Sequence, residues 1–205
     1  MRETRRIFGI IIFSILCIVL IGSGCSSKAN PSTGGGDSSQ LLKNVYNDGV
    51  FVFGDLPWLT TKQEVMKQKQ LDDSNSEKGD VLKAEESFSF NNSSLKKIVI
   101  YRFSDDKFVS GEYLFSTTDN KLFAQFCEEL KTNLSKTLPK PNANDLNILD
   151  GAGDASAQGK NVSWEGKDHS TLTVNLLTAE QGKDTEYLLQ IKSSSPLPER
   201  QGLKP

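Results

Sequence analysis

The stretch VLKAEESFSFNNSSLKKIVIYRFSDDKFVSGEYLFS, residues 81–116, decides the fold. It contains three runs rich in β-branched and aromatic residues, at 81–90, 95–103 and 108–116. Runs of this length and composition are typical of strands. The polar segments NNSS and SDDK separate them, and both have the length and residue types of hairpin turns. The pattern therefore predicts an antiparallel meander.

A short helix is expected before this meander. Either Thr60 with Gln63 or Thr61 with Glu64 forms a capping box, which is a typical start of a helix. The helix should end near Gln70.

A longer helix is expected after the meander. It begins after Thr118 or Asp119 and ends near Leu138, because two prolines follow. Its apolar side chains recur at helical spacing and predict one buried stripe, which consists of Phe123, Phe126, Cys127, Leu130 and Leu134.

The rest of the chain adds strands to the same sheet. Residues 50–59 begin as a strand and end in a Gly/Pro turn, and three more strands are expected at 162–165, 171–177 and 186–193. Residues 139–161 have little periodicity, and we expect a long mobile connection there. The expected fold is α+β, an antiparallel sheet of about six strands with two helices packed on one face.

The N-terminus has the pattern of a secretory signal. A charged tip precedes an unbroken apolar run at 7–21, then Gly22-Ser23-Gly24 and Cys25. The apolar run is shorter than a typical membrane-spanning helix, and polar residues follow it directly. We therefore expect residues 1–24 to be a signal peptide that is removed.

A cysteine directly after such small residues resembles the lipobox of bacterial lipoproteins. The resemblance implies that Cys25 becomes the lipid-bearing N-terminus, with acyl chains such as palmitate. Gly22 departs from the family, which prefers Leu, Val or Ile there. An ordinary secretory signal cleaved near Gly24, or an uncleaved anchor, remains the alternative. About two acyl chains are needed for stable attachment, and the diacylglyceryl group of this family supplies them.

The composition of the mature chain indicates its segments and argues against some classes of function. Residues 25–40 are rich in Ser and Gly and are expected to be a flexible tether. A single domain at 41–195 and a flexible tail at 196–205 follow. Removal of residues 1–24 leaves 21 basic and 25 acidic residues, a net charge of −4, which argues against nucleic-acid binding. Cys127 is then the one unmodified cysteine, so no intramolecular disulfide is expected.

An order of aromatic residues along 50–193 resembles a known group of small envelope domains. Trp58 precedes the first helix, Tyr101-Arg102-Phe103 lies in the meander, Pro141 follows the long helix, and Trp164 opens the last strands. This order is similar to that of the β-lactamase-inhibitor-protein-like domains. The resemblance implies binding of a partner through a sheet face rather than catalysis.

The sequence contains no recognisable catalytic or metal-binding motif. His169 is the single histidine and lies in a turn, so a Ser-His-Asp triad or a His/Cys zinc site is not expected. The acidic loop 72–80 resembles a calcium loop only faintly, because Lys78 stands where an EF-hand needs Gly and Ala84 where it needs Glu. We expect no enzyme activity, no cofactor and no metal.

Strand alternation predicts two different sheet faces. The face expected to lie against the helices carries Val99, Tyr101, Phe103, Tyr113, Phe115, Leu172, Val174 and Leu176. Alternate residues form an open face, and its candidate binding residues are Ile98, Ile100, Arg102, Glu112, Thr173 and Asn175. The alternative is that Ile98 and Ile100 are ordinary exposed residues or are covered by the connection near Ile148 and Leu149.

Two functions follow from these patterns. The first is a non-catalytic binding or assembly module, held by the lipid on Cys25 to the extracytoplasmic side of a bacterial membrane and bound to an envelope protein. The second is a small-solute-binding lipoprotein or a hydrolase, with its pocket under residues 139–161.

The anchor is directly testable. We expect native material to begin at Cys25 with the added mass of a diacylglyceryl group and to leave the membrane only with detergent, as measured by intact-mass spectrometry and membrane fractionation. An unmodified N-terminus, or release without detergent, would contradict the anchor.

Overall fold

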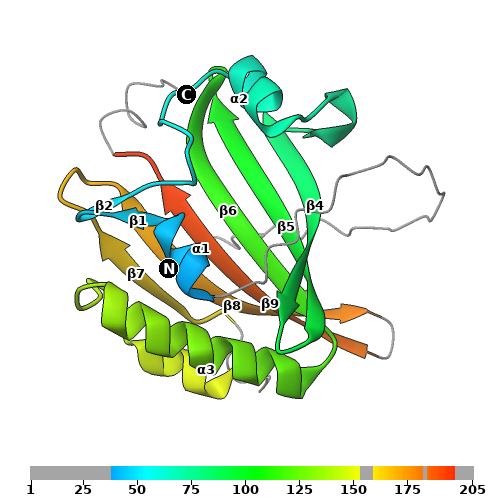
Figure 1. Ribbon diagram of the computed structural model, residues 1–205, viewed down its shortest axis with the longest axis vertical. Coiled ribbons are helices and arrows are strands. Elements are labelled where there is room, and N and C mark those ends of the chain that lie inside the picture. The colour runs from blue at the N-terminus through cyan, green and yellow to red at the C-terminus, as the bar shows by residue number, and fades with distance from the viewer. Residues whose placement is uncertain (1–37, 153–158, 182–183, 197–205) are drawn as a thin grey trace, which may run out of the picture. The chain divides into compact units, whose positions relative to one another are not determined.

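The computed structural model describes residues 38–152, 159–181 and 184–196. The signal peptide, Cys25, most of the expected tether and residues 197–205 lie outside these ranges. The main feature is a seven-stranded antiparallel sheet in the order β3-β4-β5-β6-β9-β8-β7 (Figure 1). Its strands are β3 (Ser76–Glu77), β4 (Val81–Phe90), β5 (Ser93–Ser104), β6 (Lys107–Thr117), β7 (Asn161–Glu165), β8 (Thr171–Gln181) and β9 (Asp184–Ser194).

Helices and a small second sheet accompany the main sheet. The helices are α1 (Ser38–Lys43), α2 (Lys62–Lys69) and α3 (Asn120–Thr137), with short 3₁₀ helices η1 (Asp73–Asn75) and η2 (Leu146–Gly151). The second sheet pairs β1 (Tyr46–Asn47) with β2 (Val50–Phe51). The α+β class with a large antiparallel sheet is confirmed. The described sheet has seven strands where about six were expected, and the described chain has three α-helices where two were expected.

The predicted meander is confirmed as β4-β5-β6. Its turns are tighter than expected, because Phe90 pairs with Ser93 and Ser104 pairs with Lys107, which leaves two residues in each turn. These turn residues are Asn91-Asn92 and Asp105-Asp106, and all four have positive φ. Asn and Asp tolerate this left-handed region better than other side chains with a Cβ, and two-residue hairpins require it.

Both expected helices form where their caps predicted. Thr61 is the N-cap of α2 and makes the reciprocal capping-box bonds with Glu64, so the second of the two proposed pairs is the correct one. Asp119 caps α3 by accepting a hydrogen bond from the backbone N–H of Leu122 at 3.0 Å. The five expected residues of the α3 stripe are all buried.

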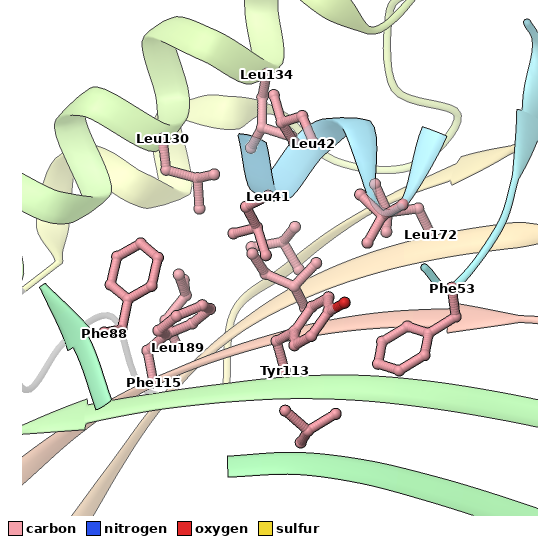
Figure 2. Close-up of a cluster of buried hydrophobic side chains, with 14 of the residues drawn as sticks. Leu41, Leu42, Phe53, Phe88, Tyr113, Phe115, Leu130, Leu134, Leu172 and Leu189 are labelled. Carbon is pink, nitrogen blue, oxygen red and sulfur yellow. The ribbon is translucent and has the colours of Figure 1, made fainter. Parts of the chain in front are cut away.

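The core lies between α3 and one face of the sheet. Figure 1 shows α1 and α3 on the same face, and Figure 2 shows leucines of both helices directed toward sheet residues. Every residue predicted for this face is buried, namely Val99, Tyr101, Phe103, Tyr113, Phe115, Leu172, Val174 and Leu176. α2 adds Val65 to the same cluster and η2 adds Leu149. The described helices that contribute buried core residues therefore all lie on one side of the main sheet.

Phe53 packs its ring against two tyrosines of this core. Its ring stacks on Tyr113, with centroids 4.6 Å apart, and lies edge-on to Tyr101. Gly111 leaves the space for this ring, since a Cβ built at Gly111 would lie 2.1 Å from Phe53 Cγ. Phe53 reaches this place from a bridge to Leu56 and not from the strand expected over 50–59, because β2 ends at Phe51 and pairs with β1 instead of joining the main sheet.

The expected tether is wrong over its last three residues. α1 begins at Ser38, which is fully buried. The Ser38 hydroxyl donates to Glu129 Oε1 at 2.5 Å and accepts from Asn133 Nδ2 at 2.6 Å, both on α3. The folded domain therefore includes residues 38–40, because α1 packs Leu41 and Leu42 into the core.

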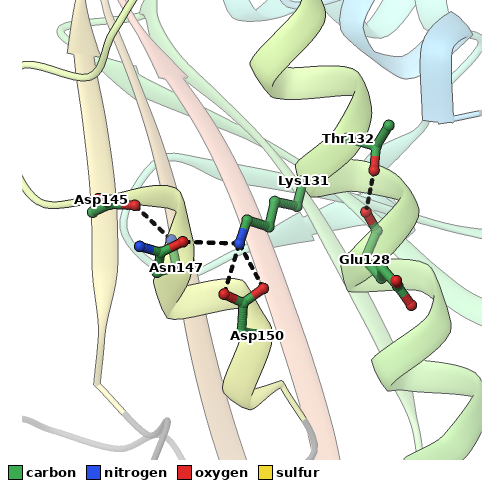
Figure 3. Close-up of polar contacts among 6 residues, drawn as sticks. All are labelled: Glu128, Lys131, Thr132, Asp145, Asn147 and Asp150. Atoms are coloured by element: carbon green, nitrogen blue, oxygen red, sulfur yellow. Dashed lines mark hydrogen bonds and ion pairs between the residues drawn. The ribbon is translucent and has the colours of Figure 1, made fainter.

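The described parts of the 139–161 connection are folded, contrary to the expectation of a mobile segment. η2 packs on α3, and Lys131 Nζ bonds both carboxylate oxygens of Asp150 at 2.6 Å and Asn147 Oδ1 at 2.9 Å (Figure 3). Trp164 Nε1 donates to the carbonyl of Pro139 at 2.9 Å. Residues 153–158 lie outside the described ranges.

The two edges of the sheet differ. At one edge β3 pairs with β4 only at Val81 and Leu82. At the other, Ala143 forms a bridge to Ser163 of β7. Most of β4 therefore has no described strand on its outer side.

The contact between Phe53 and Gly111 yields a stability prediction. Gly111→Ala should lower the free energy of unfolding by about 1–3 kcal/mol, because the added methyl group collides with the buried Phe53 ring. Urea denaturation measures this loss. In the Phe53→Ala background the same substitution should cost much less, since the ring is gone. Equal losses in both backgrounds would contradict the contact.

Candidate interaction face

The six candidate binding residues all lie on the sheet face opposite α3. Directly paired residues of neighbouring antiparallel strands share a face. Ile98 pairs with Leu114 and Ile100 with Glu112, which in turn pairs with Lys192. Thr173 also pairs with Lys192, and Asn175 pairs with Gln190. We call this surface, which extends over β5, β6, β9 and β8, the interaction face.

The candidates differ in exposure. Arg102 is exposed, and Ile98, Thr173 and Asn175 are half-buried. Ile100 is buried at 6 % exposure and Glu112 at 1 %. Ile100 lies outside the main core cluster.

A chain of hydrogen bonds crosses the face from β5 to β8. Arg102 Nε donates to Glu112 Oε1 at 2.5 Å, and Gln190 Nε2 donates to Glu112 Oε2 at 2.7 Å. Asn175 Nδ2 donates to Gln190 Oε1 at 2.7 Å. Each of the four adjacent strands contributes one side chain, so the sheet itself fixes the geometry of the network.

Glu112 is the centre of this network and its charge is matched by cations. A buried carboxylate loses its hydration and needs hydrogen bonds and opposite charge in exchange. Both of its oxygens accept a hydrogen bond, and Lys192 Nζ lies 3.7 Å from Oε1, within ion-pair distance. The side chains of Arg102 and Lys192 remain 44 % and 36 % exposed.

Gln190 and Lys192 join this network and were not among the candidates. Both belong to the strand predicted at 186–193, and they alternate with the buried residues Leu189 and Ile191. The alternation that placed the other candidates would also have placed these two. The pairing of β9 with β6 and β8, which brings them beside Glu112 and Asn175, has no signal in the sequence.

The connection near Ile148 and Leu149 does not cover Ile98 and Ile100. Leu149 belongs to the core cluster on the α3 side, and Ile148 packs against that cluster. Cover by these two residues, one of the two alternative explanations for the apolar residues of the face, is therefore wrong. The pocket of the alternative function was expected under this same connection, where Leu149 is buried at 2 % exposure.

Other reactive groups are inert or solvent-exposed. His169 is exposed in the turn after β7, with Nδ1 2.5 Å from Glu165 Oε1. Cys127 is fully buried, and burial raises the pKa of its thiol above the ordinary value, so the nucleophilic thiolate is disfavoured. In the acidic loop, Asp72 caps η1 by accepting from the Ser74 backbone N–H at 2.8 Å. No group of three or more His, Cys, Asp or Glu side chains among the described residues could hold a metal ion.

Neither a membrane-spanning helix nor a family can be assigned from the described residues and the comparisons with known proteins. None of the helices in the described ranges has the length and apolar character needed to cross a bilayer. No known family model matches the chain, and no curated protein or solved structure matches it. The resemblance to β-lactamase-inhibitor-protein-like domains and the lipobox assignment stay predictions.

Arg102 and Lys192 should contribute unequally to stability, because their contacts with the buried Glu112 carboxylate differ. Arg102→Gln should lower the free energy of unfolding by about 1.5 kcal/mol, because it removes a charge-assisted hydrogen bond to Glu112. Lys192→Gln is the matched control and should cost less than about 1 kcal/mol, since its ion pair is longer and partly solvated. Urea denaturation of both variants measures the difference.

The double variant Arg102→Gln/Glu112→Gln should lose less stability than the sum of its single substitutions, because an amide at position 112 no longer needs a cation. Additive losses, or equal losses for the two cations, would contradict the central role of Glu112.

Proposed function

We propose that this protein is a lipid-anchored module on the extracytoplasmic side of a bacterial membrane, and that it binds a partner protein through the interaction face. The anchor in this proposal rests on the basic tip, the apolar run and Cys25. The binding part rests on the architecture of the folded domain.

The observation that carries the proposal is the burial of Glu112 on a sheet face that no described helix covers. A solvated sheet face has no need of a carboxylate that is 1 % exposed and held by side chains of three other residues. Desolvating a charge costs several kcal/mol before its partners compensate. A buried ion pair is often no more stabilising than apolar residues of the same volume, so its presence here favours a role in fixing the surface. Arginine is enriched among the residues that dominate interfaces.

The composition of the face supports the same proposal. Apolar side chains of Ile98, Ile100 and Leu114 lie beside the polar network on neighbouring strands. Leu177, on the same face of β8, is the exposed large hydrophobic residue of the described chain, at 37 %. An apolar patch bordered by polar groups is the usual anatomy of a protein interface.

Site-specific photo-crosslinking in intact cells tests this function. A photoreactive amino acid at Thr173 or Leu177 of the full, processed chain should give an adduct with one envelope protein. The same amino acid at Gln125, which is exposed on α3, is the matched control and should not give that adduct. Ile98→Lys should abolish the adduct at Thr173 while the denaturation midpoint of the protein stays unchanged.

Adducts that arise equally at Gln125, or that persist after Ile98→Lys, would contradict binding through the interaction face. A soluble, unlipidated protein with a normal adduct would contradict the anchor and leave the binding face intact.

A further inference from the structure

We propose that the partner segment presents an acidic side chain to Arg102 and Lys192 and apolar side chains to the adjoining patch of Ile98, Ile100 and Leu114. This inference rests on the proposed function and specifies the chemistry of its partner. Its basis is the distribution of charge on the interaction face.

Two cations share one carboxylate at the centre of the face. Arg102 and Lys192 both lie within ion-pair distance of Glu112 Oε1, at 2.5 and 3.7 Å. Other lysines of this face are matched one to one, since Lys83 pairs with Glu77 at 2.6 Å and Lys96 with Glu85 at 3.3 Å. The centre therefore carries one positive charge more than its own acid neutralises.

Glu112 is not accessible to a partner. One oxygen accepts from Arg102 and the other from Gln190, and the side chain is 1 % exposed. A partner at this point meets the cations and not the acid. Electrostatic complementarity then favours an anionic group and opposes a cationic one, at a cost of several kcal/mol for like charges.

Arg102 is already oriented to receive such a group. Its Nε is committed to Glu112, and among the described residues neither terminal nitrogen of the guanidinium has a hydrogen-bond partner. The two terminal nitrogens match a carboxylate in bidentate geometry. Because the bond to Glu112 holds the side chain, less rotamer entropy is lost on binding than for a free surface arginine.

Ser110 gives a second indication at the same place. It pairs directly with Arg102 across β5 and β6, so the two side chains share the face. The residue is 5 % exposed, and its hydroxyl has no hydrogen-bond partner in the described part of the chain. A buried hydroxyl without a partner is unusual in folded proteins. The oxygen is itself buried, so an acceptor on a group seated at Arg102 would reach it only after the Ser110 side chain rotates.

The apolar neighbours distinguish a protein segment from a simple anion. Ile98 and Ile100 precede Arg102 on the same face of β5, and Leu114 pairs with Ile98. A carboxylate on a peptide can place its own apolar neighbours on this patch, whereas an inorganic anion leaves the patch in water. The mature net charge of −4 also argues against a polyanion such as nucleic acid.

Selection from a library of random displayed peptides on the full lipidated protein in detergent micelles tests the inference. Enriched peptides should contain Asp or Glu beside Leu, Ile or Phe. For one such peptide, Arg102→Gln and Lys192→Gln should each weaken binding about tenfold, the loss of one charge-assisted contact. Lys83→Gln, a cation of the same face that Glu77 already neutralises, is the matched control and should change nothing.

A double-mutant cycle excludes an indirect effect of folding. Replacing the peptide's acid with its amide should weaken binding to the wild type by the same factor, and should have little further effect on Arg102→Gln. Denaturation midpoints of all variants identify any that fail to fold. For a variant that does fail, the same cycle is carried out with Arg102→Lys, which keeps the charge and loses the bidentate fork.

The remaining outcomes separate this inference from the proposed function. Enriched peptides without acidic residues, whose binding is lost with Ile98→Lys, would overturn the acidic partner and retain the face. Inorganic phosphate that competes as well as the best peptide would show a general anion site and would also overturn it. Absence of enrichment would count against the acidic segment, while the crosslinking at Thr173 decides separately whether the face binds a protein.

Discussion

The pairing of β6 with β9 is the contact on which the rest of the domain depends. It joins the meander β4-β5-β6 to the antiparallel strands β7-β8-β9, which are separated in sequence by α3 and η2. On the core side it places Tyr113 opposite Ile191, and on the other side it places Glu112 opposite Lys192. A single register therefore aligns both the buried aromatic cluster and the polar network of the interaction face. A slip by one residue would move both sets to the wrong face.

The two faces of the sheet differ in chemistry and in what they contribute to the protein. The core is apolar and closely packed. Cys127, the cysteine of the described residues, is buried in it as a free thiol, so the stability of the core depends on the fit of rings such as Phe53 against Gly111. The opposite face carries a desolvated acid whose partners come from three other positions. Such a network adds little net stability. Its effect is to hold Arg102 in a fixed position beside Lys192, which is the property that the proposed binding function requires.

Local signals in the sequence were sufficient for most of the elements. Alternation placed the strands and assigned Val99, Tyr101 and Tyr113 to the core, and the apolar stripe with Asp119 placed α3. α1 was missed because its six residues, SSQLLK, are too few to show a helical period. η2 was missed for the same reason, and its place depends on a contact with Lys131 that is distant in sequence. The shared face of the six candidate residues follows from alternation, whereas the bonds of the network on that face require the order of the strands.

The sparsely covered edge of β4 restricts how another chain could attach. Glu85 and Glu86 occupy the middle of this strand, and each forms an ion pair with a lysine of β5. Charged side chains along an outer strand discourage backbone pairing with a foreign segment, since such pairing would crowd and dehydrate them. Edge-to-edge growth into fibrils is thereby disfavoured, and the proposed recognition is left to side chains on the broad surface of the sheet.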